Sequence, residues 1–256
     1  MKKILFSSFL IIFLFLVFFS GYNNSPGVII SRLPNARDIQ EVNELRYIVY
    51  FLGIIPIGEA VFNPARIEEV MGKDAYYLKA TAKTSRFFSK FFTAETFLDS
   101  FVDIRQLNPL LYRMKLTILG REDINEEIIY NQKDGFMSVS GVKRLILPNT
   151  QDPLSAMSNI MHMDFEKIKE FKMNINAHKK NYILEGVVQN KDLPINNKIH
   201  KICILKGKVF RQDKNPYHQS RVTFMLLKEK VNIPCLIEVF SGGVLIKARL
   251  VSIRGE

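Results

Sequence analysis

The feature that most constrains this chain is the alternation of apolar and polar residues in several short runs. In "LLYRMKLTILG" the apolar positions share one face of an extended chain and the polar positions share the other. "GVLIKARLVSI" and "FKMNINAH" repeat the pattern. Such alternation is typical of antiparallel sheets that are covered on one side. The three apolar faces consist of Leu110, Tyr112, Met114, Leu116 and Ile118; Val244, Ile246, Ala248 and Leu250; and Phe171, Met173, Ile175 and Ala177.

Turn signals separate these runs at short intervals. "MGKD", "NQKDG", "HKKN", "NKDLP" and "SGG" contain the residues that favour tight turns. About a dozen strand candidates result, at the spacing expected of a sandwich or barrel. No repeat or linker divides this part of the chain. We predict one mainly β domain over 44–256, a strongly curved antiparallel sheet or barrel-like domain with one or two short helices.

The stretch "LGIIPIGEAVF" contains a proline, two glycines and a carboxylate within an apolar run. Odd-numbered residues from Leu45 to Ile57 are predicted to face the core, and the same register would bury Glu59. An unpaired buried carboxylate is costly. We therefore predict that one bent strand carries a bulge at Gly58, beside Pro56, which exchanges the two faces. Glu59 would then face water, and the residues turned inward would be Ala60 and Phe62.

One helix is expected among the strands, in "NTQDPLSAMSNIMHM". Asp152 is a suitable N-cap and Pro153 suits the first turn. The apolar residues at helical spacing are Leu154, Met157, Ile160 and Met161. One interpretation is a methionine-rich ligand pocket; the other is a helix that plugs one side of a curved sheet. The candidate pocket-lining residues are Met157, Ile160, Met161, Tyr112 and Met114.

The N-terminus has the layout of a secretory signal peptide, with Lys2 and Lys3 before an apolar run from Ile4 to Phe19. That run is shorter than the ~20 apolar residues of a typical membrane-spanning helix. The residues near the exit form a poor cleavage site, so an uncleaved membrane anchor is the alternative. No cysteine follows the run to carry a lipid. We predict a signal or anchor helix over 1–25, a linker over 26–43, and a body exported to the periplasm or cell envelope.

The formal net charge is +11. The basic residues are scattered and are not interleaved with aromatic residues, which, together with export, argues against a nucleic-acid partner. Export would permit a disulfide between the two cysteines, Cys203 and Cys235. Because each cysteine lies in an apolar strand-like run, two buried thiols are the alternative.

Catalytic and cofactor motifs are absent from the sequence. There is no phosphate-binding glycine loop, nucleophile elbow or zinc-protease motif. The four histidines lack metal-ligand spacing, and "HMD" at 162–164 is better explained as a helix end. We predict a non-enzymatic protein without a cofactor. A catalytic role for Glu59 is the weaker interpretation.

Several phrases, in order, resemble one group of exported bacterial proteins. They are "ELRYIVYFLGIIPIGEAVF", "YYLKATAKTSRFFSKFF", "DSFVDIRQLNPLLYRMKL", "DPLSAMSNIM" and "TFMLLKEKVNIPCLIEVFSGGVLIKARL". The group is the domain-of-unknown-function family 3108. The resemblance covers about Glu44 to Leu250 and implies a periplasmic, strongly curved antiparallel sheet with little helix. It implies no established activity and no catalytic residue. The family usually has a charged residue where this chain has Asn232.

Three functions remain open at this point. The first is a non-catalytic envelope protein whose curved sheet holds an apolar ligand, such as a lipid or a lipoprotein acyl chain. The second is an interaction module that docks on another envelope protein through a sheet edge or a basic patch. The third is a glycan-active enzyme, which would need paired carboxylates in one cleft. Candidate carboxylates for that reaction are Glu59, Glu95, Asp99 and Asp103.

Overall fold

The computed structural model describes residues 42–195, 198–212 and 219–255. The predicted leader, 1–25, and most of the predicted linker, 26–43, lie outside these residues. The described chain forms one sheet of fourteen strands and one α-helix. The strands of the first half are β1 (Val42–Phe51), β2 (Ile55–Val70), β3 (Lys73–Thr84), β4 (Ala94–Asp103), β5 (Pro109–Ile118), β6 (Ile124–Asn131), β7 (Phe136–Val139) and β8 (Val142–Leu145).

The second half begins with the helix α2 (Pro153–His162). Its strands are β9 (Glu170–Ala177), β10 (Lys180–Ile195), β11 (Lys198–Arg211), β12 (Ser220–Lys228), β13 (Asn232–Ser241) and β14 (Val244–Gly255). A single turn of 3-10 helix, η2 (Phe88–Lys90), joins β3 to β4. The predicted mainly β, antiparallel fold is confirmed, and the predicted helix begins after Asp152.

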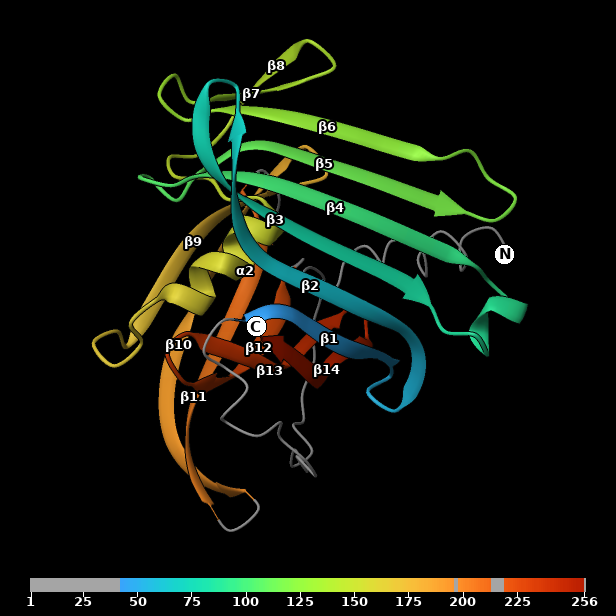
Figure 1. Ribbon diagram of the computed structural model, residues 1–256, viewed down its shortest axis with the longest axis vertical. Helices are drawn as coiled ribbons and strands as arrows, with labels where there is room; N and C mark the ends of the chain where they lie inside the picture. Colours follow the sequence, from blue (N-terminus) through green and yellow to red (C-terminus); the bar gives the residue numbers. More distant parts are fainter. Residues whose placement is uncertain (1–41, 196–197, 213–218, 256) are drawn as a thin grey trace.

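Each strand pairs antiparallel with its neighbour along the chain, except that β8 and β9 do not pair, and the first strand pairs with the last. In the β1–β14 pair, Val49 lies opposite Ala248. The sheet therefore starts at β8, runs back to β1, continues through β14 and ends at β9. Sheets this wide curl, and Figure 1 shows α2 between the part formed by β2–β4 and the part formed by β9 and β10.

The two edge strands do not pair with each other, so hydrogen-bonded strands do not close the sheet into a barrel. The segment between β8 and α2 spans the gap instead. The backbone N–H of Gln151 donates to the carbonyl of Asn174 on β9 at 2.8 Å, and the N–H of Asn176 donates to the carbonyl of Gln151 at 2.7 Å. The Asn181 amide also donates to the carbonyl of Leu145, at 3.0 Å. These bonds cover part of the β9 edge.

The stretch containing Gly58 forms a hairpin where one bent strand was predicted. Leu52 and Gly53 adopt φ values of 51° and 74°, and the chain reverses between β1 and β2. Paired turn residues with positive φ match the twist of a hairpin. The single-strand prediction was wrong because Gly53 makes a turn and not a bend.

The predicted bulge is present immediately before Gly58. Val49 pairs with Gly58 and Tyr50 with Pro56, which leaves Ile57 as the extra residue. Beyond this bulge Glu59 is exposed and Phe62 is buried, as predicted.

Of the two alternatives for the cysteines, the structure shows the buried thiols and not the disulfide. Cys203 and Cys235 are both free and buried. They lie on β11 and β13, with β12 between them. Two strand spacings, about 9.5 Å, exceed the Cα separation of about 7 Å that a disulfide can bridge. The cysteines instead belong to the apolar core between the sheet and α2.

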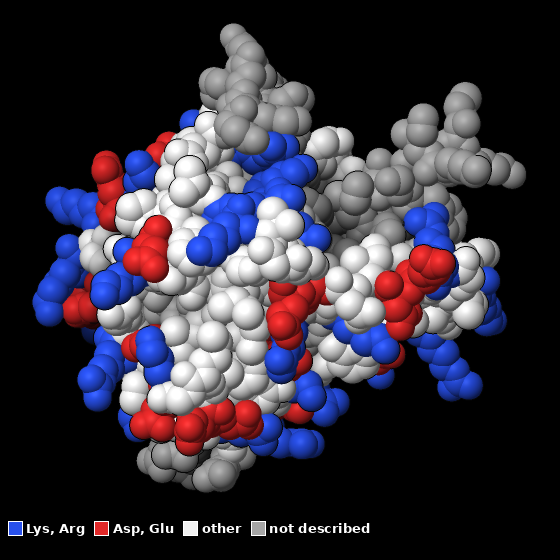
Figure 2. Space-filling model, turned by 90° about the horizontal axis from the view of Figure 1, so that it is seen from above, with Lys and Arg blue, Asp and Glu red and all other residues white. Residues whose placement is uncertain are grey.

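Lys and Arg are interspersed with Asp and Glu on the face shown in Figure 2. Three histidines lie apart: His162 ends α2, His178 lies in the β9–β10 turn and His200 lies on β11. Within the described residues no group of three or more His, Cys, Asp or Glu side chains is placed to hold a metal ion.

Candidate functional site

The N-terminus of α2 is held by a fully buried carboxylate. Asp152 accepts hydrogen bonds from the backbone N–H groups of Leu154 and Ser155, at 2.8 and 3.0 Å, and the Ser155 hydroxyl accepts one from the N–H of Asp152. The hydroxyl of Ser100, on β4, donates to the same carboxylate. Burial raises the pKa of Asp152, and these hydrogen bonds partly offset that effect. The cap therefore fixes the helix to the sheet as well as starting it.

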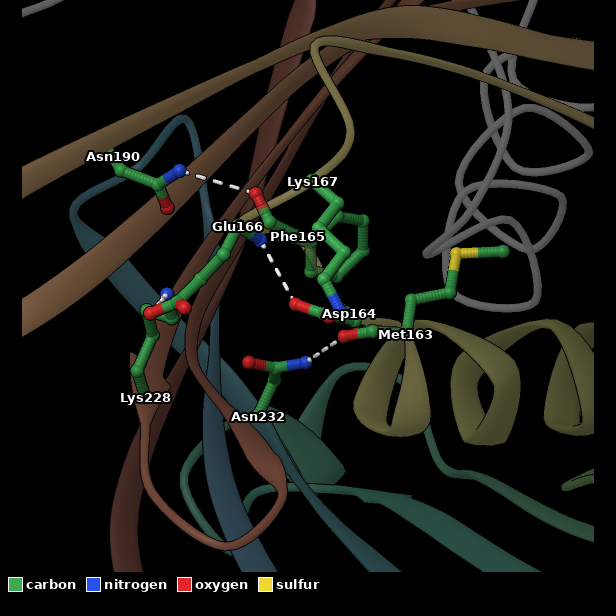
Figure 3. Close-up of polar contacts among 8 residues, drawn as sticks. All are labelled: Met163, Asp164, Phe165, Glu166, Lys167, Asn190, Lys228 and Asn232. Atoms are coloured by element: carbon green, nitrogen blue, oxygen red, sulfur yellow. Dashed lines mark hydrogen bonds and ion pairs between the residues drawn. The ribbon is translucent and has the colours of Figure 1, made fainter.

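The C-terminus of α2 is held by an amide from the opposite part of the sheet. The side-chain amide of Asn232, at the start of β13, donates to the carbonyl of Met163 at 2.7 Å (Figure 3). It also donates to the carbonyl of Ile160, at 3.5 Å. Free carbonyls at a helix end favour a donor. Asn232 is therefore a helix-capping residue in this chain.

The segment that follows α2 is held near the same helix end by contacts with β10 and β12. The Asn190 amide donates to the carbonyl of Phe165 at 3.1 Å, and Lys228 pairs with Glu166 at 2.8 Å (Figure 3). The Phe165 side chain is buried in the core. With both ends fixed, α2 forms a stationary wall across the concave side of the sheet.

A cavity of about 170 Å³ lies between α2 and the concave face, and it is partly open to solvent. Its lining is almost entirely apolar. The cavity exists because small side chains on adjacent strands do not fill this volume: Ala60 on β2, and Ala80 and Ala82 on β3. The larger residues that border it include Phe62, Leu98, Leu154, Phe224 and Ile237.

Polar side chains that reach the cavity include those of Thr96, Glu126 and His178. The buried hydroxyl of Thr96, on β4, finds no hydrogen-bond partner in the described part of the chain. Glu126, on β6, has a side chain only 7% exposed, and its carboxylate lies 3.8 Å from the ammonium of Lys179. His178 and Lys179 form the two-residue turn between β9 and β10, both with positive φ, as tight hairpins require.

Burial changes the proton affinity of two of these groups. It raises the pKa of the Glu126 carboxyl, and the attraction and hydrogen bond of Lys179 offset this only in part. Burial, followed by the charges of Lys180 and Lys179, lowers the pKa of His178. The cavity therefore disfavours charge on both side chains and suits apolar or neutral hydrogen-bonding groups.

Four of the five candidate pocket residues line the cavity: Met157 and Ile160 from α2, and Tyr112 and Met114 from β5. Met161 does not line it; this side chain packs into the core on the same helix. Sequence reasoning turned Ala60 inward but did not identify it as cavity lining, and it missed Ala80 and Ala82 altogether. The spacing of Ala80 and Ala82 in "LKATAKT" signals a strand with small side chains on one face.

The carboxylates considered for glycan chemistry do not meet at this cavity. Thr96 and Leu98 line it from β4, so Glu95 and Asp99 point to the other face of that strand. Asp99 accepts a hydrogen bond from the Tyr77 hydroxyl. Asp103 accepts bonds from the backbone of the following turn, and Glu59 is exposed.

Comparison with known proteins places the chain in a family. The family model described as "Protein of unknown function (DUF3108)" matches residues 46–248. The chain belongs to this family. The match covers nearly all of the described sheet, from within β1 to within β14. No curated protein matches.

Solved structures add a likeness in fold. The protein is similar to a β-barrel-like protein of the domain of unknown function DUF1849 from Brucella abortus. The TM-score is 0.56 at 11% identity, over 84% of this chain and 97% of the other. A DUF1329 family protein from Desulfovibrio piger also matches, at 10% identity over 86% of this chain and 89% of the other, with a TM-score of 0.20. The first likeness supports a barrel-like fold for this DUF3108 chain and carries no function with it.

Among the described residues, no helix has both the length and the apolar character needed to cross a bilayer.

Proposed function

We propose that this DUF3108 protein is an exported, non-catalytic envelope protein that binds the apolar part of an amphipathic molecule, such as a lipid or a lipoprotein acyl chain. The observation that carries the proposal is the apolar cavity between α2 and the small residues of β2 and β3. Well-packed interiors leave few voids larger than a water molecule. An enclosed apolar cavity of similar size in another protein stays dry and accepts apolar ligands.

The cavity volume limits what it can hold. It is close to the roughly 150 Å³ that accommodates benzene in an engineered protein cavity. The cavity at about 170 Å³ therefore suits one end of an acyl chain, while the rest of the ligand extends through the open side. The capped ends of α2 argue against a large opening of the helix to admit more.

The Thr96 hydroxyl supplies the polar contact. A buried hydroxyl without a partner is unfavourable by about 1–3 kcal/mol, and Thr96 is such a group. A ligand carbonyl or hydroxyl beside it would satisfy this group. The ligand class is therefore an apolar chain that carries a neutral polar group near its bound end.

Two measurements on the full chain purified from the envelope test the proposal: the ligand that co-purifies with the protein, and the uptake of a fatty acid by the protein. Native mass spectrometry and lipid extraction should show a co-purifying amphipathic molecule, and a fluorescent fatty acid should be taken up. Ala80→Leu, which fills the cavity, should abolish uptake. Lys79→Leu is the matched control, since Lys79 is exposed on the other face of β3. Equal uptake by both variants, or no ligand and no uptake, would contradict the proposal.

A second candidate function is docking of a partner strand on β8. All four residues of this edge strand are exposed, and Leu145 is 81% exposed. An exposed edge can accept a strand from another protein. Lys143→Pro, which removes an N–H that points to the free edge and not to β7, should then abolish cross-linking to an envelope partner without affecting fatty-acid uptake. Unchanged cross-linking would exclude this surface.

A further inference from the structure

Three connections at one end of the sheet carry exposed, large apolar side chains. In an antiparallel meander every second turn lies at the same end, and the β1–β2 turn, the β3–β4 connection with η2, and the β5–β6 turn all lie at the right in Figure 1. Hydrogen bonds join them: the N–H of Ser85 donates to the carbonyl of Ile57 at 2.8 Å, and the N–H of Leu119 donates to the carbonyl of Thr93 at 3.1 Å.

We call this surface the apolar rim and define it by Ile54, Phe87, Phe91 and Leu119. Their side chains are 77%, 66%, 72% and 78% exposed, respectively. A single exposed leucine needs no explanation, but exposed apolar residues gathered on adjoining turns mark an interaction surface.

The aromatic part of the apolar rim is held in place. The N–H of Ser89 donates to the carbonyl of Ser85 at 2.8 Å, and the N–H of Phe92 donates to the carbonyl of Phe88 at 2.9 Å. Phe88 packs against the apolar cluster at this end of the sheet, whose buried members are Val49, Ile57 and Ile246. This anchor presents the rings of Phe87 and Phe91, whose centroids lie 6.2 Å apart, to solvent.

Basic residues flank these rings. Arg86 and Lys90 alternate with the phenylalanines in "SRFFSKFF", and both are exposed. Neither forms an ion pair with another described residue. Two acidic residues at this end lie on the β5–β6 turn, where Asp123 pairs with Lys115 at 3.1 Å and Glu122 is exposed. A third, Glu95, is exposed at the start of β4, opposite Lys83 on β3.

We propose that the apolar rim docks on an anionic lipid bilayer, with Phe87 and Phe91 inserted at the level of the headgroups. Aromatic side chains concentrate at membrane interfaces, and neighbouring Arg and Lys are attracted to anionic lipids. Charge complementarity favours this partner, because Arg86 and Lys90 flank the rings. A protein partner is the other outcome of the test.

The apolar rim also adjoins the cavity. Ala60 and Ala82 line the cavity and pack against the same cluster that anchors Phe88. Docking at the rim would therefore bring the cavity close to lipid. The membrane proposal does not depend on ligand binding, and the two are measured separately.

The chain contains no tryptophan, so a single introduced tryptophan reports its own surroundings. Phe91→Trp in the full chain places the reporter on the apolar rim. Ile199→Trp is the matched control, because Ile199 is 76% exposed on the β10–β11 hairpin, away from the rim. Both proteins are mixed with vesicles of phosphatidylethanolamine and anionic phosphatidylglycerol that carry bromine-labelled chains.

The proposal expects a blue shift and strong quenching of the Phe91→Trp emission, with no change for Ile199→Trp. Added salt, or vesicles of phosphatidylcholine alone, should weaken the quenching. Arg86→Glu with Lys90→Glu in the Phe91→Trp chain should weaken it too. An unquenched Phe91→Trp, as expected if the rim meets a protein, would overturn the proposal. Equal quenching of both reporters would also overturn it, because an N-terminal anchor alone could bring the whole protein to the vesicle.

Discussion

The strands β2–β4 and the strands β11–β13 both turn residues toward the interior of the curved sheet, but they enclose different interiors. On β11 and β12 the inward positions carry large buried side chains, among them Leu205 and Leu226. The opposite face of β11–β13 also carries buried side chains, at Ile202 and Ile233. On β2–β4 the inward positions include Ala60, Ala80, Ala82 and Thr96, which border the cavity. The size of the inward residues therefore decides whether the interior is solid.

The largest expected difference comes from the same truncation in both regions. Leu226→Ala, on β12, removes a fully buried side chain from packed surroundings and should lower the free energy of unfolding by about 2–5 kcal/mol. Leu98→Ala, on β4, should lower it by less than half as much, since Leu98 already borders the cavity. Urea denaturation measures both. Equal losses would show that the two interiors are packed alike.

The next largest difference in stability between the regions should come from the addition of one or two methyl groups. Gly186 on β10 lies opposite Gly207 on β11, and a Cβ at Gly186 would approach the carbonyl oxygen of Lys206 to 2.2 Å. Gly186→Ala should therefore destabilise the protein by about 1–3 kcal/mol. Ala82→Val, which adds volume beside the cavity, should leave the denaturation midpoint nearly unchanged. A harmless Gly186→Ala would contradict the close packing of β10 on β11.

The helix α2 lies between the two regions, and substitution of Asn232 tests whether its fixed end controls the cavity. Asn232→Ala leaves the carbonyls at the end of the helix without their donor and should destabilise the protein by about 1 kcal/mol. Fatty-acid affinity should fall as well, because α2 is a wall of the cavity. Asn190→Ala removes a similar bond from the segment beyond the helix and is the control. If both variants bind equally, the helix end does not control the cavity.

The smallest effect concerns Glu126 and pH. Its pKa in the folded protein is raised from the ordinary 4.5, so folding favours the protonated form. Stability from this group is full below pH 4.5 and is lost as the pH rises through the folded-state pKa. Glu126→Gln should therefore raise Tm slightly at neutral pH and have no effect at about pH 4. A lower Tm at neutral pH would show that the contact with Lys179 dominates.

Much of the fold could be predicted from particular residues. The alternation of Tyr112, Met114 and Leu116 identified the buried face of β5, and Asp152 with Pro153 located the start of α2. Strand partners could not be predicted, because alternation specifies faces and not neighbours. The pairing of β1 with β14 and the separation of the cysteines by β12 both depend on that order.

The candidate site was predicted only in part, because alternation does not specify which strands lie next to one another. Met157 and Ile160 were identified from helical spacing, and Tyr112 and Met114 from a strand. Glu126 was missed because it lies near the start of β6, next to exposed residues. The turn containing His178 and Lys179 reaches it from the other half of the sheet, a contact that no local pattern contains.

The central claim is that the space beneath α2 is apolar and accepts apolar atoms. Diffraction from crystals of the protein under xenon pressure tests it most directly, because xenon enters dry apolar cavities. The account predicts a xenon atom in contact with Ala82, Leu98 and Met157. Ordered water in that space, or side chains that fill it and exclude xenon, would contradict the account.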